Sequence, residues 1–487
     1  MSASRIAYTV AAPTIAEQRR VRDEVSPSVD LVELRLDALP SIDVRALLAD
    51  RVRPVIVTCR PAWEGGGFTG GEDDRCRILT EALEAGAEYV DVEWRASFVD
   101  AICRRAPHRV VVSSHDFAGV PADLDSRVRA MRALGARTVK VAVTATALSD
   151  MVRLGGVDDG GTGERVLIAM GTRGVASRVL AARFGSAWTY AGGASIAPGQ
   201  PTLGDLLETY RFRHIGASTP VYAVVGRPIA HSLSPTLHNA AFGAAGVDAV
   251  YVPLEAADWA DFERAAAFFD LQGCSVTAPF KRDAMRAATI VDAGVRETGA
   301  ANTLKRVGQT WHARNTDIEG FLAPLAVPEV AGRRVHVLGA GGAARAVVCA
   351  MKERGAQVTL HARNPDAARA VASALGVAAA PTFAPEPGSW DVLVNSTPVG
   401  TAPHLAESPL EASALGEALA GKVVYDLVYN PAETRLLRDA ALRGATVISG
   451  RSMLVAQAEA QFAWWTGRPA PTDVMRDVLD RRLRGSA

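Results

Sequence analysis

Charged side chains alternate with apolar ones inside several short apolar runs of the first 215 residues. In Val32–Asp37 the charged positions are Glu33, Arg35 and Asp37, and Lys140 stands in a run of the same kind. Because successive side chains of a strand point to opposite faces, the charges of such a run share one face. Carboxylate, guanidinium and ammonium groups gathered in one interior could carry acid–base or nucleophilic chemistry; the alternative is a buried ion network.

A second group of polar residues lies between residues 221 and 328. Ser232 and Ser234 stand two residues apart at the start of an expected helix, where they could bind a ligand or merely cap the helix. Lys281 and Asp317 follow, among further Asn, Thr and Ser residues. This set suits a polyol substrate, with Lys281 and Asp317 as a proton-transfer pair, although composition alone does not establish it.

A glycine-rich turn with the G-x-G-x-x-G/A spacing begins at Gly339 and continues through Gly341 to Ala344. An apolar strand precedes it and an expected helix, Ala343–Glu353, follows. In that setting the turn indicates a dinucleotide site, because the glycines allow a tight turn and close approach of the pyrophosphate.

The next expected strand, Gln357–Leu360, ends without the Asp or Glu that an NAD-selective site places near the ribose. Arg363 stands there instead. A guanidinium suits a 2′-phosphate and favours NADP; the alternative is a solvated arginine.

These residues need scaffolds, and the first 215 residues contain eight β-rich runs, most of them separated by 20 to 35 residues with helix-compatible segments. Such spacing predicts a (β/α)₈ barrel, whose chemistry sits at the C-terminal ends of the strands. The runs are Ile6–Val10, Leu31–Leu36, Pro54–Cys59, Tyr89–Glu93, Arg109–Ser113, Thr138–Val143, Val166–Met170 and Ala187–Tyr190.

Turn-rich stretches divide the remainder, and the fold class is α/β throughout. We predict a barrel over 1–215, a linker over 216–220, an α/β substrate-binding domain over 221–328 plus 451–487, and a Rossmann domain over 329–450.

The composition narrows the partners. The 487 residues contain 53 Lys+Arg and 53 Asp+Glu, so no basic footprint for nucleic acid or anionic membrane exists, and small neutral or acidic metabolites remain. The five cysteines show no CxxC pair and no zinc-ligand spacing, which predicts no metal site and favours a reducing, cytoplasmic compartment. We see neither a transit peptide nor a long apolar segment. The oligomeric state stays open, with a monomer plausible.

The second half of the chain resembles shikimate dehydrogenase along residues 221–487. The matching segments are His231-Ser232-x-Ser234-Pro235, Thr277-x-Pro279-Phe280-Lys281, Asn302-Thr303, Asn315-Thr316-Asp317, the glycine-rich turn, Asn395-Ser396-Thr397-Pro398-x-Gly400, Asp426-x-x-Tyr429-x-Pro431 and Gly450-x-x-Met453-Leu454-x-x-Gln457. The resemblance implies NADPH-dependent reduction of 3-dehydroshikimate, with Lys281 and Asp317 as the catalytic dyad. Substrate binding is implied for Ser232, Ser234, Thr277, Asn302, Tyr429 and Gln457. Binding of NADP(H) is implied for Gly339, Ala340, Gly341, Gly342, Ala343, Arg363 and Thr397.

The first half resembles type I 3-dehydroquinate dehydratase. The matching segments are Glu33-Leu34-Arg35-x-Asp37, Arg60-x-x-x-Glu64-Gly65-Gly66, Ser114-His115-Asp116-Phe117, Val139-Lys140-Val141, Met170-Gly171-x-x-Gly174-x-x-Ser177-Arg178 and Ala197-Pro198-Gly199-Gln200. The resemblance implies a Schiff base on Lys140, acid–base chemistry by His115 and orientation of His115 by Glu64. Substrate binding is implied for Glu33, Arg35, Arg60, Arg178 and Gln200.

The whole chain is therefore similar to the fused dehydratase–dehydrogenases of the shikimate pathway, in which the first product is the second substrate. We expect desolvation and neighbouring cations to lower the pKa of Lys140, so that its amine can attack a ketone. Three positions depart from the family pattern: Ile196 replaces the serine of a lid segment, Ser275 replaces an asparagine, and Ala362 and Asn364 flank Arg363. The alternatives are a quinate-preferring, NAD-using fusion and a ligand-sensing pseudoenzyme.

Overall fold

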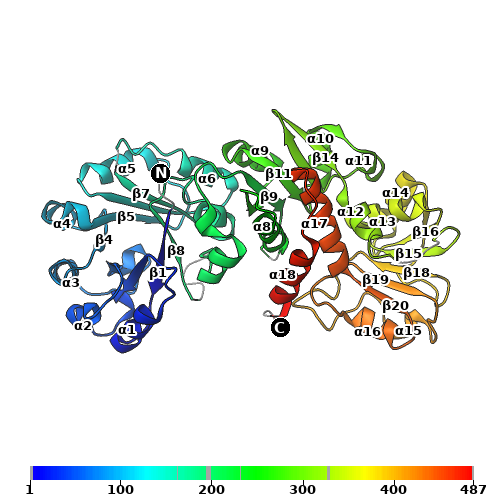
Figure 1. Cartoon of the computed structure of the whole chain (residues 1–487), viewed down its shortest axis with the longest axis horizontal. Coiled ribbons are helices and arrows are strands. Elements are labelled where there is room, and N and C mark those ends of the chain that lie inside the picture. Colours follow the sequence, from blue (N-terminus) through cyan, green and yellow to red (C-terminus); the bar gives the residue numbers. More distant parts are fainter. Residues whose placement is uncertain (1–3, 162, 194–198, 231, 326–329, 485–487) are drawn as a thin grey trace. The chain divides into compact units, whose positions relative to one another are not determined.

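The computed structural model describes residues 4–161, 163–193, 199–230, 232–325 and 330–484 (Figure 1). Its contacts divide the chain into two compact units. The first consists of residues up to Val221 together with two later segments, Pro228–His231 and Asp248–Asp270. The second contains the rest. Our sequence-based boundaries do not anticipate that Asp248–Asp270 groups with the first 221 residues.

The first unit contains a parallel sheet of eight strands in the order β7-β6-β5-β4-β3-β2-β1-β8, as predicted for a (β/α)₈ barrel. A bridge between Arg165 and Ser186 joins the two ends of this order. The strands are β1 (Arg5–Val10), β2 (Leu31–Arg35), β3 (Val55–Thr58), β4 (Tyr89–Glu93), β5 (Val110–Asp116), β6 (Thr138–Thr144), β7 (Glu164–Met170) and β8 (Trp188–Ala191).

The barrel interior is layered by the two-residue period of its strands. Leu31, Ile56, Tyr89, Val111 and Trp188 belong to one buried apolar cluster. Two positions farther along the same strands, on the same face, stand Glu33, Thr58, Asp91, Ser113 and Tyr190, all of which are buried. The polar layer therefore lies toward the C-terminal ends of the strands, where barrel enzymes carry their chemistry.

Helices connect these strands: α1 (Ile15–Glu24), α2 (Val44–Leu48), α3 (Glu72–Glu84), α4 (Val99–Arg105), α5 (Leu124–Ala133), α6 (Leu148–Gly155) and α7 (Val175–Val179). The segment Asp248–Asp270 adds β10 (Val250–Glu255) and α9 (Trp259–Phe268) to this unit.

Helix α6 is capped by that added segment. Its N-cap residue, Ala147, has no polar side chain, so the first amides of the helix need an acceptor from elsewhere. Asp261 of α9 provides it: Leu148 N donates to Oδ2 at 2.9 Å and Ser149 N to Oδ1 at 2.8 Å. Asp261 is 1% exposed, and although burial alone would raise its pKa, these backbone donors hold it below the usual value. Phe184 of the barrel sequence packs against Phe268 beside this cap, with ring centroids 5.8 Å apart.

In the second unit, strands of a mixed sheet follow one another in the order β9-β11-β13-β14-β12. They are β9 (Val221–Gly226), β11 (Leu271–Val276), β12 (Ala288–Val291), β13 (Thr303–Val307) and β14 (Thr310–Arg314). The helices of this part are α8 (Ser234–Ala244), α10 (Lys281–Ala287), α11 (Ala293–Thr298), α12 (Thr316–Leu322), α17 (Gly450–Thr466) and α18 (Thr472–Arg484). The C-terminal helix α17 returns to this sheet, because Trp465 Nε1 donates to Leu304 O at 2.9 Å.

The other part of the second unit is a parallel sheet in the order β17-β16-β15-β18-β19-β20, a doubly wound arrangement. Apolar clusters cover its two faces, one including Val335, Val337 and Val394, the other Leu338 and Leu393. Its elements are β15 (Arg334–Leu338), α13 (Gly342–Glu353), β16 (Gln357–His361), α14 (Pro365–Leu375), β17 (Ala378–Ala379), β18 (Val392–Asn395), α15 (Ala412–Leu415), β19 (Val423–Asp426), α16 (Arg435–Ala441) and β20 (Thr446–Ser449).

Among the described residues, no helix has the length and apolar character needed to cross a membrane.

Candidate functional sites

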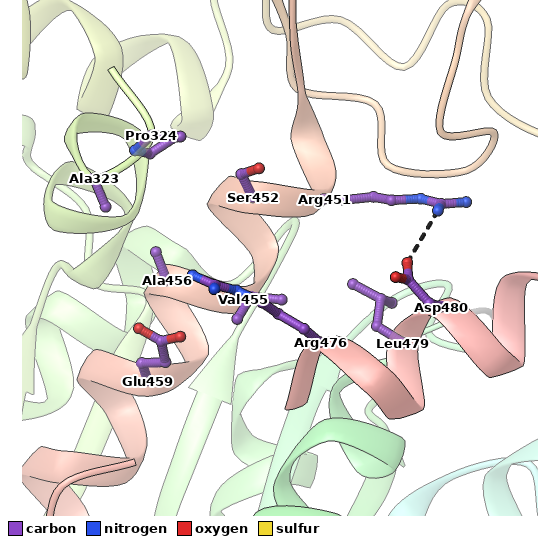
Figure 2. Close-up of a pocket in the computed structure, with 10 residues that line it drawn as sticks. All are labelled: Ala323, Pro324, Arg451, Ser452, Val455, Ala456, Glu459, Arg476, Leu479 and Asp480. Carbon is purple, nitrogen blue, oxygen red and sulfur yellow. Dashed lines mark hydrogen bonds and ion pairs between the residues drawn. The ribbon is translucent and has the colours of Figure 1, made fainter. Parts of the chain in front are cut away.

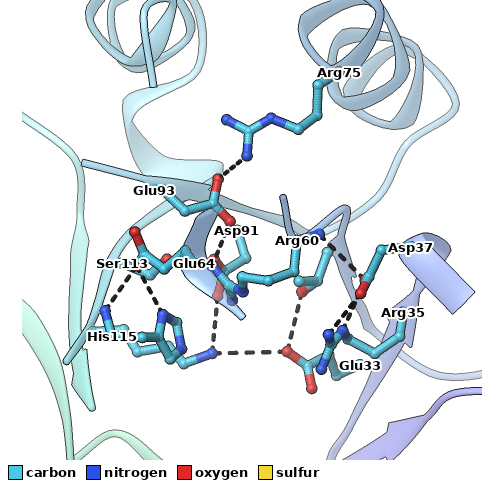
Figure 3. A network of polar contacts seen from close by, with 12 residues as sticks. Glu33, Arg35, Asp37, Arg60, Glu64, Arg75, Asp91, Glu93, Ser113 and His115 are labelled. Atoms are coloured by element: carbon cyan, nitrogen blue, oxygen red, sulfur yellow. Dashed lines mark hydrogen bonds and ion pairs between the residues drawn. The ribbon is translucent and has the colours of Figure 1, made fainter. Parts of the chain in front are cut away.

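Lys140 lies at the centre of a buried polar network in the barrel (Figure 3). Its Nζ is 3.0 Å from Asp91 Oδ2, 3.8 Å from Glu33 Oε1 and 4.5 Å from the ring centroid of Tyr190. Glu33 in turn accepts hydrogen bonds from Thr9 at 2.9 Å and Thr58 at 3.1 Å. The ammonium group is therefore fixed by two carboxylates that are themselves held in place.

The pKa of Lys140 contradicts our expectation from the sequence. Burial lowers it, as expected, but the facing carboxylates of Asp91 and Glu33 outweigh burial and raise the pKa above its ordinary value. The sequence shows that Lys140 is inward-facing and thus desolvated; it does not show which charges face it. Lys140 is held as an ammonium and must lose a proton before it can act as a nucleophile.

Arg60 connects this lysine site to a second layer of charge. Its guanidinium lies 3.0 Å from Asp91 Oδ1 and also pairs with Glu93, which is fully buried. The second oxygen of Glu93 pairs with Arg75 of α3, whose side chain is 0% exposed. Ser113 bridges the network, accepting from Arg60 at 2.9 Å and donating to Asp91 at 2.6 Å. The result is an ordered chain of alternating charges from Arg75 to Lys140.

His115, at the end of β5, makes a separate pair with Glu64. His115 Nδ1 is 3.0 Å from Glu64 Oε1, which also accepts the His115 amide at 2.7 Å (Figure 3). Burial, with Arg60 and Lys140 nearby, holds the pKa of His115 well below its ordinary value. Burial also raises the pKa of Glu64 to about 7, although Arg60 opposes the shift. With Nδ1–H directed at an ionised Glu64, Nε2 of a neutral His115 is available as a base.

Arg178 and Gln200 are buried side chains with unused donors. Arg178 is 3% exposed and Gln200 8% exposed, and neither Arg178 Nε nor Gln200 Nε2 has a hydrogen-bond partner. Burial lowers the pKa of Arg178 only to about 10, so it stays charged at neutral pH. An acceptor-rich ligand such as a carboxylate fits these donors. Arg35 pairs instead with Asp37 at 2.7 Å, and Ile196 lies outside the described residues.

In the second unit, Lys281 and Asp317 form the predicted pair, with Lys281 Nζ 2.6 Å from Asp317 Oδ2. Lys281 is the first residue of α10 and Asp317 lies in the first turn of α12, which Asn315 caps. Asn302 donates to Asp317 Oδ1 at 2.7 Å and fixes the carboxylate. An ammonium held in this way can donate a proton to a developing alkoxide.

The other predicted substrate residues of this half lie on neighbouring elements. Ser234 is 8% exposed and its amide receives a hydrogen bond from Ser232 Oγ as acceptor at 3.3 Å; Thr277 N donates to Val225 O at 2.9 Å. Gln457 of α17 packs tightly on α12, since an ideal Cβ at Gly320 would lie 2.7 Å from Gln457 Cβ. Burial raises the pKa of Tyr429.

Gln461 is a buried residue of this region that our sequence analysis missed. Its Oε1 accepts from Ser275 Oγ at 2.8 Å, and its Nε2 donates to Thr303 Oγ1 at 3.0 Å. His238 Nε2 is 3.1 Å from the same Oε1. Ser275, the departure that sequence alone left uninterpreted, is thus a hydrogen-bonding member of the layer beneath Asn302 and Thr303. The four-residue spacing from Gln457 places Gln461 on the same helix face and was the available signal.

The glycine-rich turn has the shape that a dinucleotide requires. Gly339 has φ of 117°, and an ideal Cβ there would lie 2.4 Å from Ser396 Oγ, so only glycine fits. At Gly341 no atom lies within 4 Å of an ideal Cβ, which leaves room for a pyrophosphate over the start of α13. At Gly342 the same Cβ would be 3.1 Å from Lys281 Cδ, so this turn and the Lys281–Asp317 pair adjoin.

Thr397 and Arg363 occupy different edges of this fold. Thr397 Oγ1 donates to Asn395 Oδ1 at 2.7 Å, which orders the turn after β18. Arg363 follows β16, is exposed, and makes no ion pair or hydrogen bond with the described residues. Its neighbour Asn364 caps α14, and Arg369 is paired with Asp366. Arg363 is therefore the cation at this edge that fits a 2′-phosphate.

Within the described ranges, no group of three or more His, Cys, Asp or Glu side chains is arranged to hold a metal ion.

Comparison with protein families assigns both halves. Residues 6–217 match the model for type I 3-dehydroquinase, residues 224–304 the shikimate dehydrogenase substrate binding domain, and residues 450–479 the shikimate 5′-dehydrogenase C-terminal domain.

Individual relatives agree. The chain is 36% identical over 487 residues to the chloroplastic bifunctional 3-dehydroquinate dehydratase/shikimate dehydrogenase of Arabidopsis thaliana, covering 93% of this chain and 80% of that protein. It is 38% identical to the NADP(+) shikimate dehydrogenase of Synechocystis sp., covering 56% of this chain and 99% of the relative. A crystal structure of a shikimate dehydrogenase in complex with NADP+ superposes with a TM-score of 0.52 at 30% identity, covering 55% of this chain and 97% of that one.

Proposed function

Because the chain belongs to the family of bifunctional 3-dehydroquinate dehydratase/shikimate dehydrogenases, we propose that its two polar sites act in sequence on one carbon skeleton. The enzyme dehydrates 3-dehydroquinate to 3-dehydroshikimate and reduces 3-dehydroshikimate to shikimate with NADPH. The names of the relatives favour neither a quinate-preferring fusion nor a pseudoenzyme.

For the dehydration we propose that Lys140 is the nucleophile. After losing a proton, its amine adds to the ketone of 3-dehydroquinate and expels water, which forms a protonated Schiff base. His115 Nε2 then takes the proton from the carbon next to the imine carbon and returns it to the departing hydroxyl. Hydrolysis of the imine releases 3-dehydroshikimate and restores Lys140. The 3.0 Å contact between His115 and Glu64 supports the assigned roles, because it selects the tautomer.

We further propose that Arg178 and Gln200 bind the substrate carboxylate and hydroxyls, with Arg35 and Glu33 completing the site. The unpartnered, buried donors of Arg178 and Gln200 support this assignment. Asp91 and Arg60 then hold Lys140 in place and balance its charge before the substrate arrives.

For the reduction we propose that Lys281 gives a proton to the alkoxide that forms at the ketone carbon, while Asp317 positions the ammonium. NADPH supplies the hydride for that carbon when bound. Gly339 to Ala343 and Thr397 would hold the cofactor's pyrophosphate and neighbouring groups, and Arg363 its 2′-phosphate. Ser232, Ser234, Thr277, Asn302, Tyr429 and Gln457 would bind the substrate hydroxyls and carboxylate.

The observation that carries this proposal is the presence, in one chain, of a buried lysine with a His–Glu pair and a separate Lys–Asp pair beside a glycine-rich turn. The test supplies 3-dehydroquinate and NADPH together, follows nicotinamide absorbance, and measures shikimate. We expect equal amounts of NADPH consumed and shikimate formed. A folded protein that consumes no NADPH under these conditions refutes the two-step function.

A second experiment addresses Lys140 directly. Borohydride added with 3-dehydroquinate reduces a Schiff base to a stable amine, so the mass of the peptide containing Lys140 increases. Lys140→Met should show no such increase and Lys281→Met should retain it. Labelling that persists in Lys140→Met contradicts the assignment.

We also propose the domain boundaries given above, a monomeric state and a cytoplasmic location. The five cysteines, none of which forms a disulfide in the structure, suit a reducing compartment. Light scattering of the purified protein tests the monomer: a mass near twice 51.2 kDa refutes it.

A further inference from the structure

A cavity of about 430 Å³ lies between α12, α17 and α18 of the second unit, away from the two sites described above (Figure 2). Ala323 and Pro324, just after α12, form one wall. The other walls come from α17 and α18. The cavity thus adjoins the helix that carries Asp317 and the helix that carries Gln457.

Helical periodicity separates this cavity from the shikimate site. The lining residues of α17 are Ser452, Val455, Ala456 and Glu459, which are spaced i, i+3, i+4, i+7 and share one helix face. Gln461 lies on a different face, where it hydrogen-bonds Ser275 and Thr303. A ligand in the cavity would therefore contact α17 without displacing the substrate residues.

Two of the four charged groups in the cavity are already paired with each other. Arg451 Nη1 lies 3.2 Å from Asp480 Oδ1, and Arg451 Nε donates to Tyr429 O at 3.4 Å. This pair closes one end of the cavity (Figure 2).

The other two charged groups have opposite sign and no partner. Glu459 Oε1 is buried and lacks a hydrogen-bond donor. Arg476 extends from α18 across the cavity toward Ala456 and Glu459, yet among the described residues it forms no ion pair or hydrogen bond (Figure 2). A carboxylate oxygen without a donor is costly, and a ligand that supplies the donor removes that cost.

We propose that this cavity binds an α-amino acid with an apolar side chain. The ammonium group supplies the donor that Glu459 lacks, and the carboxylate pairs with the Arg476 guanidinium. The apolar side chain lies against Val455, Ala456 and Leu479. A zwitterion matches both unpaired charges without adding net charge, whereas a simple anion or cation would satisfy one and leave the other.

The test is isothermal titration calorimetry of the full chain with L-leucine as the probe. Two matched compounds each lack one charge: 4-methylpentanoate has no ammonium group and 3-methylbutylamine has no carboxylate. We expect L-leucine to bind and both analogues to bind at least tenfold more weakly, because each loses a charge-assisted hydrogen bond. Glu459→Gln and Arg476→Gln should each weaken L-leucine binding at least tenfold.

Arg481→Gln is the matched control, since Arg481 is an exposed arginine of the same helix outside the cavity. It should bind L-leucine as the parent does. Unchanged shikimate oxidation by all three variants shows that they are folded. The proposal is overturned if L-leucine does not bind at its solubility limit, if either analogue binds as tightly, or if Arg481→Gln weakens binding as much as Arg476→Gln.

Discussion

The barrel interior and the Lys281–Asp317 site both hold an ammonium beside a carboxylate, yet they differ in how much charge surrounds the pair. Around Lys140 lie Asp91, Glu33 and Arg60, all at most 4% exposed. Around Lys281 and Asp317 the contacts are neutral, from Asn302 and the backbone of Gly342.

The difference follows from the chemistry. A site that makes and breaks a covalent bond with its own lysine must control the protonation of that lysine within the protein. A site that borrows its reductant from a cofactor needs chiefly to position one proton donor beside the glycine-rich turn. Buried charge therefore concentrates where the protein itself is the reagent.

The strongest test of this contrast removes each lysine separately. Lys140→Met should reduce dehydratase activity by roughly 10⁴-fold or more, because the nucleophile is lost, and leave reduction of added 3-dehydroshikimate unchanged. Lys281→Met should lower only the reductase, by about 10²- to 10⁴-fold, as expected for loss of a general acid. Assays of each step with its own substrate check both. A parallel loss of both activities in either variant contradicts the separation of the sites.

Arg75 tests whether the charged chain is needed as a unit. Arg75→Met leaves Glu93 with Arg60 as its remaining charged partner, and breaking this buried pair should cost about 3–5 kcal/mol of unfolding free energy. Arg77→Met on the same helix breaks an exposed pair with Asp74 and should cost less than about 1 kcal/mol. Urea unfolding measures both.

If Arg75 is a positioning residue, its loss must also move the dehydratase pH profile, through Glu93 and Arg60. A variant that is less stable but keeps the parent profile limits Arg75 to a structural role. Reductase kinetics should not change in either variant.

The acid limb of the two reactions should differ because of Glu64. Burial raises its pKa to about 7, so below that pH Glu64 is protonated and no longer accepts from His115 Nδ1–H. Dehydratase kcat/KM should therefore fall as the pH drops through about 7, approaching tenfold per unit if the protonated form is inactive, and the fall should be absent in Glu64→Gln, whose rate is low throughout. A flat dehydratase profile between about pH 6 and 8 would falsify this role.

The smallest expected effect comes from the glycine-rich turn. An added methyl group at Gly342 meets Lys281 Cδ at 3.1 Å, so Gly342→Ala should displace the lysine slightly and lower reductase kcat about tenfold. Gly341→Ala meets no protein atom and should instead raise KM for NADPH, because the methyl group fills the space for the pyrophosphate. Steady-state kinetics with varied NADPH separate the two outcomes; equal effects on kcat and KM in both variants would contradict the arrangement.

Much of the scaffold could be predicted because it depends on local periodicity. Two-residue alternation around Glu33 and Asp91 indicated which side chains enter the barrel, and the glycine spacing after β15 indicated the dinucleotide turn. Both patterns are written in consecutive residues.

What the sequence did not reveal depends on contacts between distant elements. Arg75 reaches Glu93 from a helix surface that looks like any other charged helix, and the direction of the Lys140 pKa depends on distances to Asp91 and Glu33. Ser275 acquires its meaning only from Gln461, which is 186 residues away in sequence.

The cap that Asp261 places on α6 has a consequence for how this chain is made. During synthesis the eight barrel strands leave the ribosome before the residue that satisfies Leu148 N and Ser149 N has been added. The barrel unit is complete only after Asp270 has emerged, so a translation product that stops at the linker is expected to carry an uncapped helix and an uncovered Phe184. Gene fusion has in this respect made the older half of the polypeptide wait for the younger one.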